Sequence, residues 1–374
     1  MRLTAQLKLQ PTPEQSDALR RTLERANAAC NYISECAWAS ETFRQFDLHK
    51  LCYREVRHRF GLAAQVAVRC ISKVADGYKL DHRIKRTFRP LSATAYDARI
   101  LSYSESGVSL WSLDGRLAIP FTCGNRQRGL LGSRQGETDL AFVRGEWYLL
   151  ATCVVPEAPP VTGPPMGVDL GIRNTAATSN GTLHSGAARQ QFKQQRHKIR
   201  ASLQSRNNRR ARKALRRQSG RERRRISWEN HNLSKAIVTE AEGTPCGTIR
   251  MERLAGIRKR CKIWNKHSNR MVAGWSFAQL QAFVAYKAAR CGIKMEYVEP
   301  AYTSQTCATC GVLGVRRGDV FSCTTCGKVH ADSNAAVNVA RGGVAQDAKH
   351  RARKPARMTA RCKSVSHIVK SRRL

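Results

Sequence analysis

An alternation of apolar and polar residues opens the chain. In the first ten residues, MRLTAQLKLQ, every odd position is apolar and every even position is polar or basic. A period of two residues predicts a half-buried β-strand, and it differs from the continuous apolar core of a signal peptide. No stretch of the sequence approaches the roughly 20 consecutive apolar residues of a membrane span, so we expect no membrane partner.

The pattern then changes to the spacing of helices. Thr12 suits the N-cap, Pro13 the first helical position and Gln15 the glutamine position of a capping box. Helical spacing continues to about Leu80, with a stop at Gly61. These residues predict a helical segment directly after the first strand.

From about Arg86 the period changes again. Short runs rich in β-forming residues are broken by Gly, Ser and Asp, which predicts strands joined by turns. We interpret them, with the first strand, as a small β-barrel or sandwich into which the helical segment is inserted. Residues 156–167, PEAPPVTGPPMG, then form a proline-rich connector.

A different order of elements follows the connector. Residues 167–177 predict a strand, and Asn180 with Gly181 predicts a hairpin turn before a returning strand. We expect one long polar helix from Arg189 to about Glu240. After it, GTIRMERLAG predicts a strand, GWSFAQLQAFVAYKAARCG an amphipathic helix and IKMEYVEP another strand. This order predicts an α/β unit with a mixed sheet.

The excess of positive charge indicates what the protein binds. The chain of 374 residues contains 66 Lys and Arg against 27 Asp and Glu, a formal net charge of +39. Such an excess repels itself unless a polyanion neutralises it, and phosphate backbones are the usual polyanion. With 41% hydrophobic residues, the composition is that of a globular protein of roughly two or three domains. We therefore expect a folded protein that binds nucleic acid.

Basic residues crowd the first part of the predicted long helix. A solvated face is the alternative interpretation, but a run this uniform in sign would repel itself, so phosphate contact is favoured. Arginine also suits the two-pronged hydrogen bonding of phosphate. The candidate nucleic-acid-binding residues are Arg209, Arg210, Arg212, Arg216 and Arg217.

Most of the fourteen cysteines show no paired spacing. In a chain of this length we interpret the scattered ones as reduced, mostly buried thiols of a cytosolic protein. They are Cys30, Cys36, Cys52, Cys70, Cys123, Cys153, Cys246, Cys261, Cys291 and Cys362.

Four cysteines form two pairs. Cys307 and Cys310, like Cys323 and Cys326, are separated by two residues, a gap that lets all four thiolates meet one tetrahedral ion. Zinc is the usual occupant, and four protein ligands leave no open position, so such a site is structural. Two redox disulfides are the alternative.

Three acidic residues stand among apolar and small residues. They are Asp169 in GVDLGI, Glu252 in IRMERLAG and Asp332 in DSNAAVNVA. Each has an ordinary alternative: a turn residue for Asp169, an ion pair with a neighbouring arginine on an edge strand for Glu252, and a helix N-cap for Asp332. Their joint placement on two strands and a helix of one α/β unit favours a shared site.

A carboxylate within a core strand is costly unless a charge compensates it. Magnesium prefers hard oxygen ligands, usually carboxylates together with water and substrate phosphates. Two such ions about 4 Å apart can activate water and stabilise the leaving oxygen in phosphodiester cleavage. This chemistry agrees with a nucleic-acid partner.

The same residues carry a family resemblance. GVDLGI, RMERLAGIR and HADSNAAVNVA resemble the three motifs of the RuvC nuclease domain, which has the RNase H-like fold. The cysteine motif, with TAQLKLQPTPEQSDALRRTLERANAACNYI, WENHNLSKAIV and PAYTSQTCATCG, resembles the TnpB family over about residues 1–342. These proteins are insertion-sequence-encoded, RNA-guided DNA nucleases related to type V CRISPR effectors. The resemblance implies that Asp169, Glu252 and Asp332 bind the catalytic magnesium ions.

The resemblance also implies a domain organisation. An α/β RNase H-like (RuvC) nuclease domain carries an inserted zinc knuckle, and a β-barrel wedge domain with a helical insertion precedes it. The boundaries that we expect are 1–10 and 86–158 for the wedge domain, 11–85 for the helical recognition domain, 159–302 and 329–343 for the nuclease domain, 303–328 for the zinc-binding knuckle, and 344–374 for a basic, disordered tail.

We therefore expect an RNA-guided, magnesium-dependent DNA endonuclease of the prokaryotic cytoplasm, with guide RNA and target DNA as partners. One alternative is a nuclease-inactive, RNA-guided DNA-binding regulator, which the three acidic residues disfavour. The other is a strand-transferring transposase, which would also use three acids and two metal ions. A transposase must bind transposon ends by itself, and the sequence contains no helix-turn-helix pattern that would do so.

Overall fold

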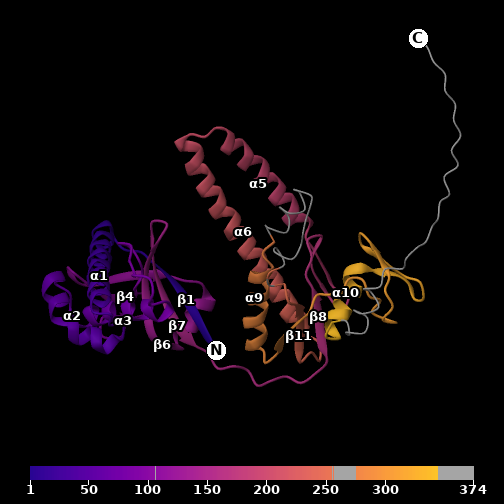
Figure 1. The fold of residues 1–374 in the computed structure, drawn as a ribbon, viewed down its shortest axis with the longest axis horizontal. Coiled ribbons are helices and arrows are strands. Elements are labelled where there is room, and N and C mark those ends of the chain that lie inside the picture. Colours follow the sequence, from indigo (N-terminus) through magenta and orange to yellow (C-terminus); the bar gives the residue numbers. More distant parts are fainter. Residues whose placement is uncertain (106, 255, 257–274, 344–374) are drawn as a thin grey trace, which may run out of the picture. The chain divides into compact units, whose positions relative to one another are not determined.

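The computed structural model describes residues 1–105, 107–254, 256 and 275–343 (Figure 1). The chain divides into two compact units, Met1–Pro156 (unit 1) and Glu157–Leu374 (unit 2). The expected tail, 344–374, lies outside the described residues, as do Cys261 and Cys362. None of the helices in the described ranges has the length and hydropathy of a membrane span.

Unit 1 combines one long sheet with a group of helices that follows the first strand. Its elements are β1 (Arg2–Leu9), α1 (Pro13–Ala39), α2 (Gln45–Phe60), α3 (Ala64–Leu80), β2 (Thr94–Tyr96), β3 (Leu101–Tyr103), β4 (Gly107–Ser112), β5 (Gly115–Thr122), α4 (Asn125–Leu131), β6 (Arg134–Val143) and β7 (Glu146–Val154).

The helices of unit 1 begin and end as their sequence predicts. Thr12 and Gln15 form the capping box at the start of α1, with hydrogen bonds of 3.2 and 3.1 Å between side chain and backbone. Pro13 is the first helical residue. Gly61 ends α2 with a φ of 60°, a conformation that glycine adopts without steric cost.

The sheet of unit 1 is barrel-like. Its strand order is β2-β6-β7-β1-β5-β4-β3, and every pair is antiparallel. Two hydrogen bonds join strands from the two ends of this order. The Tyr96 hydroxyl on β2 donates to the carbonyl of Trp111 on β4 at 3.2 Å, and the Tyr103 hydroxyl on β3 lies 2.9 Å from that of Thr138 on β6.

Unit 2 has the mixed α/β order that the sequence predicts. Its described elements are β8 (Pro165–Asp169), β9 (Asn174–Thr178), β10 (Leu183–Ser185), α5 (Ala187–Ser205), α6 (Arg209–Glu242), β11 (Thr248–Glu252), α9 (Phe277–Arg290), β12 (Lys294–Val298), β13 (Val315–Arg317), β14 (Val320–Cys323), β15 (Gly327–His330) and α10 (Ala331–Ala340).

The main sheet of unit 2 has the order β10-β9-β8-β11-β12. The strands β8, β11 and β12 are parallel, whereas β9 and β10 are antiparallel to their neighbours. A separate three-stranded antiparallel sheet, β13-β14-β15, lies between β12 and α10 in the sequence. The cysteine pairs belong to this inserted element.

The two faces of the main sheet carry different helices (Figure 1). Met166 and Val168 of β8 pack in one core with residues of α6 and α9. Gly167 and Asp169 face the opposite side of the sheet, because successive side chains of a strand point to alternate faces. On that face Gly167 admits α10: a Cβ at Gly167 would lie 2.0 Å from the carbonyl oxygen of Ala336. Asp169 shares the face of Gly167, so it is directed toward α10.

The structure differs from the sequence prediction at the first hairpin of unit 2. The expected single strand 167–177 is two antiparallel strands, β8 and β9, with Asp169 opposite Ala177. The chain reverses between them at a turn that requires Gly171, since a Cβ there would lie 2.6 Å from the carbonyl oxygen of Asn174. The predicted turn at Gly181 is present, with a φ of 94°, and connects β9 to β10.

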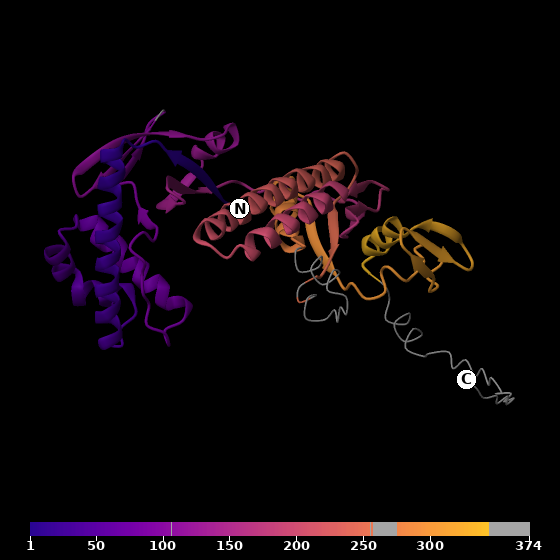
Figure 2. The ribbon, with the colours of Figure 1, turned by 90° about the horizontal axis from the view of Figure 1, so that it is seen from above.

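The expected long helix is likewise two helices. The helices α5 and α6 run side by side (Figure 2), and the chain breaks between them at Arg206–Asn208. Asn207 has a φ of 38°, and the Asn208 side chain caps α6 by accepting a hydrogen bond from the Ala211 amide at 2.8 Å. Asparagine tolerates positive φ and is a good N-cap, so the two asparagines allow the reversal.

Candidate active site and cysteine cluster

Three carboxylates come together where two parallel strands end. Asp169 is the last residue of β8, Glu252 the last of β11, and Asp332 the second of α10. Their exposed fractions are 9%, 8% and 4%. Since Met251 lies opposite Val168 in the parallel pair, the next residue on each strand, Glu252 and Asp169, leaves the sheet at the same edge.

The structure contradicts the ordinary alternatives for two of these acids. Asp169 ends a buried strand and precedes the turn. Glu252 is not on an edge strand, because β11 lies between β8 and β12. The neighbouring Arg250 instead pairs with Glu296 at 2.8 Å.

Asp332 is not the N-cap of its helix. His330 occupies that position, and no side-chain hydrogen bond caps α10. The Asp332 oxygens accept hydrogen bonds from the guanidinium of Arg316 at 2.5 Å and from the Asn174 amide at 2.8 Å. This aspartate is therefore held by long-range partners, one on β9 and one on the inserted element.

The acids affect one another electrostatically. Burial, followed by the negative charges of Glu252 and Asp332, raises the pKa of Asp169 to about 8, although Arg316 opposes the rise. Burial also raises the pKa of Glu252, while a hydrogen bond from Thr303 lowers it. The site thus concentrates more negative charge than its neighbours compensate, and a cation is favoured there.

The four cysteines form a tighter cluster. Their sulfur atoms all lie within 4.8 Å of one another, and elsewhere in the described ranges no three His, Cys, Asp or Glu side chains reach this proximity. A tetrahedral zinc–sulfur distance of about 2.3 Å separates the sulfurs by about 3.8 Å, and the sulfurs of Cys310 and Cys323 are 3.5 Å apart. The cysteines therefore offer one four-sulfur metal site.

The thiols of the cluster differ in how readily they ionise. A hydrogen bond with Cys310, followed by burial, raises the pKa of Cys326 to about 12, whereas the pKa values of Cys307 and Cys323 are lowered. The cysteines are free, and a disulfide requires about 2.05 Å between sulfurs. Burial opposes ionisation of Cys307, yet the amides of Cys310 and Thr309 and the neighbouring thiols lower its pKa to about 6. The amides of Cys326 and Thr325 likewise lower the pKa of Cys323. Thiolates are the form that binds metal.

The scattered cysteines of the described ranges are also free. Five of them are buried and the other three are half-buried. The expectation of mostly buried thiols is confirmed for these residues.

An open hollow adjoins the carboxylates. Its volume is 760 Å³, and Arg173 and Arg316 contribute to its lining together with the turn at Gly318 and Asp319. Arg173 pairs with Asp319 at 2.6 Å, so the tip of the inserted element is joined to the β8–β9 turn. The hollow brings two guanidinium groups next to the acidic site.

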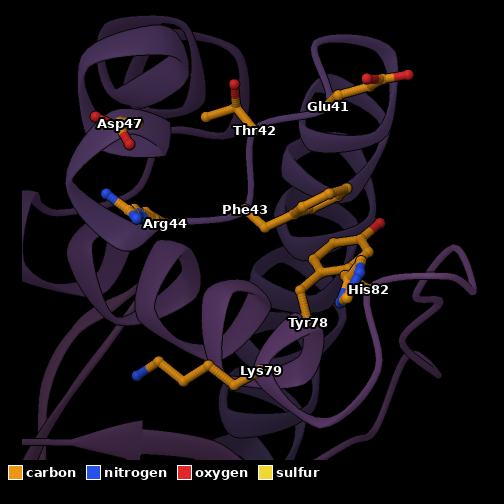
Figure 3. Close-up of a pocket in the computed structure, with 8 residues that line it drawn as sticks. All are labelled: Glu41, Thr42, Phe43, Arg44, Asp47, Tyr78, Lys79 and His82. Carbon is orange, nitrogen blue, oxygen red and sulfur yellow. The ribbon is translucent and has the colours of Figure 1, made fainter.

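Unit 1 contains a hollow of another kind (Figure 3). It measures 460 Å³ and lies between the loop before α2 and the end of α3. The rings of Phe43 and Tyr78 lie 4.6 Å apart at its side. Its acids, Glu41 and Asp47, are exposed, so this hollow lacks buried carboxylates like those of Asp169, Glu252 and Asp332.

The predicted nucleic-acid-binding arginines lie near the start of α6, in the helical pair of Figure 2. All five are exposed, and none is in an ion pair with the part of the chain that the structure describes. They are Arg209, Arg210, Arg212, Arg216 and Arg217.

Sequence reasoning missed the residues that contact the acids. Asn174 is the first residue of β9, Thr303 lies in the turns before the first cysteine pair, and Arg316 is on the short strand β13. None belongs to a motif with a recognisable spacing to an acid. Thr303 stands in PAYTSQTCATCG, directly before the first cysteine pair, and this proximity is the one signal that could have drawn attention to it.

Comparisons with known proteins agree with this geometry. Residues 277–339, which contain the four cysteines and Asp332, match the family model described as Cas12f1-like, TNB domain. Over 115 residues the chain is 41% identical to the CRISPR-associated endodeoxyribonuclease Cas12f1 of Sulfoacidibacillus thermotolerans, covering 30% of this chain and 26% of that protein. Over 112 residues it is 36% identical to the TnpB-like protein MJ0751 of Methanocaldococcus jannaschii, covering 30% and 40%.

A solved structure resembles the chain over a greater length. It is the cryo-EM structure of a Cas12f1-sgRNA-target DNA complex, with a TM-score of 0.60 and 16% identity, covering 88% of this chain and 83% of that chain. At this identity the likeness concerns the fold. The chain covers 26% and 40% of the lengths of the two curated relatives, so those alignments concern a part of each.

The fold and the site together define an α/β unit in which a four-cysteine element is inserted before the last helix, and the chain has the fold of the Cas12f1 structure. The resemblance that the motifs predict is confirmed. Over parts of its length the chain is similar to Cas12f and TnpB-like proteins.

Proposed function

We propose that this chain is an RNA-guided, divalent-metal-dependent DNA endonuclease. The observation that carries the proposal is the convergence of Asp169, Glu252 and Asp332, all buried, from two strand ends and a helix. The names of the relatives support the proposal. One relative is named a CRISPR-associated endodeoxyribonuclease and another a TnpB-like protein. The net charge of +39 agrees with two nucleic-acid partners, a guide RNA and a target DNA.

The acidic site fits magnesium. Its ligands are carboxylate oxygens, which magnesium prefers, and the raised pKa of Asp169 reflects negative charge that a cation would compensate. Asp169, Glu252 and Asp332 would hold two ions. When bound, the two ions activate a water molecule and stabilise the leaving oxygen of a phosphodiester.

Other side chains prepare the site for its substrate. Arg173 and Arg316 line the adjoining hollow, where guanidinium groups would bind the phosphates of a DNA strand. Arg316 hydrogen bonds Asp332 in the structure, so it compensates one of the three carboxylates. Thr303 and Asn174 orient Glu252 and Asp332 by hydrogen bonds.

The four cysteines, Cys307, Cys310, Cys323 and Cys326, would hold one structural zinc ion. Their closed set of four sulfurs leaves no position for substrate. The ion would fix the inserted element, which carries Arg316, next to Asp332. The acidic site and the cysteine site are thus separate, and they lie together because the cysteines precede α10 in the sequence.

The domain boundaries expected from the sequence form part of the proposal. Residues 1–10 and 86–158 would form the wedge domain and 11–85 the recognition domain, whereas 159–302 and 329–343 would form the RuvC-like domain around the knuckle 303–328. The exposed arginines at the start of α6 would contact nucleic-acid phosphates.

A reconstituted complex tests the function. The protein is expressed with its native flanking DNA, the RNA that co-purifies is sequenced, and the guide portion is replaced to match a plasmid with a randomised flanking region. We expect magnesium-dependent cutting of matched plasmids only, and only beside particular flanking sequences. Recovery of random RNA fragments, or cutting that ignores the guide, would contradict the proposal. Guided binding without cutting would favour the regulator instead.

A further inference from the structure

The loop that leads into the cysteine cluster also contacts the acidic site. Thr303 is 1% exposed, and its hydroxyl lies 2.5 Å from the Glu252 carboxylate and 3.1 Å from the carbonyl of Pro300. A hydroxyl has one proton to donate, and an ionised carboxylate is the stronger and nearer acceptor. With Glu252 ionised, Thr303 therefore donates to Glu252.

Two asparagines of α10 fix the position of this loop. The Asn338 amide donates to the carbonyls of Thr303 at 2.8 Å and Thr306 at 2.7 Å. The Asn334 amide donates to the same Thr306 carbonyl at 2.7 Å and accepts from the Ala308 amide at 2.8 Å. Both asparagines are 5% exposed. Because their hydrogen bonds replace those of water, displacing the loop would leave buried polar groups unpaired.

This network connects two acids that lie on different elements. Asp332 is on α10, and the asparagines of the same helix hold Thr303, which in turn holds Glu252 of β11. The Gln281 amide fixes the Glu252 backbone carbonyl at 2.8 Å, which leaves the direction of the carboxylate to Thr303. The relative placement of Glu252 and Asp332 thus depends on one threonine hydroxyl.

We propose that Thr303 is a positioning residue, which aims the Glu252 carboxylate at the place where a metal ion shared with Asp169 and Asp332 would bind. This inference rests on the proposed function. Groups that hydrogen bond a metal ligand typically change metal affinity about 10- to 100-fold when they are removed. The effect of Thr303 should accordingly appear in metal binding before it appears anywhere else.

The chain offers a matched control in the same loop. Thr306 is 4% exposed, and its hydroxyl has no hydrogen-bond partner within the described ranges. Replacing either threonine by valine keeps the shape and removes the hydroxyl. Only Thr303→Val removes a bond to an acid.

The experiment titrates manganese into the full chain, freed of nucleic acid, by calorimetry. Thr303→Val should bind manganese about tenfold more weakly than the unaltered protein, while Thr306→Val and Thr303→Ser should bind it with unchanged affinity. In the guided cleavage assay, Thr303→Val should need about tenfold more magnesium for half-maximal rate and recover most of its rate at saturation.

Unchanged manganese affinity in Thr303→Val would overturn the inference, as would an equal loss in Thr306→Val. If Thr303→Val does not fold, the manganese affinity of Thr303→Ser, which keeps the hydroxyl, tests the inference. An affinity as low as that of a Glu252→Gln variant would exclude a role for the hydroxyl. The outcomes separate this inference from the proposed function. If Thr303→Val cuts DNA under guidance and binds manganese with normal affinity, only the positioning role of Thr303 is contradicted. If the unaltered protein binds manganese but shows no guided cutting, only the proposed function is contradicted.

Discussion

At the scale of single residues, Asp169 gives the site a pH dependence. Its pKa is about 8 in the folded protein against an ordinary value of 3.8, because it is buried beside Glu252 and Asp332. Between these values the folded state keeps a proton that the unfolded chain has lost, so this contribution to stability is complete below about 4 and lost as the pH rises through about 8.

We therefore expect the urea concentration at the midpoint of unfolding, measured without magnesium, to decrease as the pH is raised from 5 to 8.5. The decrease should be larger in the unaltered protein than in Asp169→Asn. Magnesium in excess should reduce that difference, since a bound cation favours the ionised carboxylate. The same pH dependence in both proteins would show that Asp169 does not titrate in this range.

Single residues also show how far sequence alone reaches. The three acids could be singled out because a charge amid apolar residues is visible in the sequence. Their partners could not, since Asn174, Thr303 and Arg316 contact acids that are 158, 51 and 16 residues away in the sequence. The N-cap interpretation of Asp332 was wrong, because the helix begins at Ala331 and the N-cap residue is His330, two residues before Asp332.

At the scale of elements, the inserted cysteine element should depend on its metal. Cys326→Ser should reduce bound zinc from about one ion per chain to well below one and should destabilise unit 2, because structural zinc contributes folding free energy directly. It should also weaken manganese binding, since the loop that ends at the cysteines carries Thr303. Metal analysis and thermal unfolding check this expectation.

The control for the cysteine element is Cys123→Ser, which alters a half-buried cysteine of unit 1 outside the cluster and should leave zinc content unchanged. A Cys326→Ser protein with full zinc content and unaltered stability would contradict the structural role.

The start of α6 makes a separate prediction about phosphate contacts. Replacing its five exposed arginines, named above, by glutamine should lower affinity for nucleic acid of any sequence, because phosphate contacts do not specify sequence. If all five contact phosphates, the slope of log affinity against log salt should fall by about 4. Replacement by lysine keeps the charges and should largely preserve the slope. A slope unchanged by the glutamine variant would assign this face to solvent.

The elements themselves were largely predictable, and the exceptions have physical causes. The capping box at Thr12 and the glycine stop at Gly61 are local signals, and both are confirmed. The breaks at Gly171 and Asn207 were missed, because a single residue of unusual backbone conformation reverses the chain within an otherwise continuous pattern. Local propensity indicates the type of an element more readily than its end.

At the scale of the whole molecule, charge and topology point to the same function. The net charge of +39 indicates polyanionic partners, whereas only the strand order β10-β9-β8-β11-β12 explains how three acids far apart in the sequence come together. Sequence patterns could predict an α/β unit, but the sheet order required the structure. Affinity for the guide RNA should fall steeply with salt, and weak salt dependence measured by filter binding would contradict a phosphate-dominated interface.

The comparison of Asp332→Ala with the unaltered protein tests the central claim most directly. Both proteins are assembled with the same guide RNA, and target binding and cutting are measured on the same DNA, with Asp76→Ala, which alters an exposed acid of unit 1, as the control. We predict equal binding, and cutting reduced at least roughly a thousandfold in Asp332→Ala, because residues that act as a unit fail together. Folded Asp332→Ala protein that binds and cuts its target normally would contradict the account.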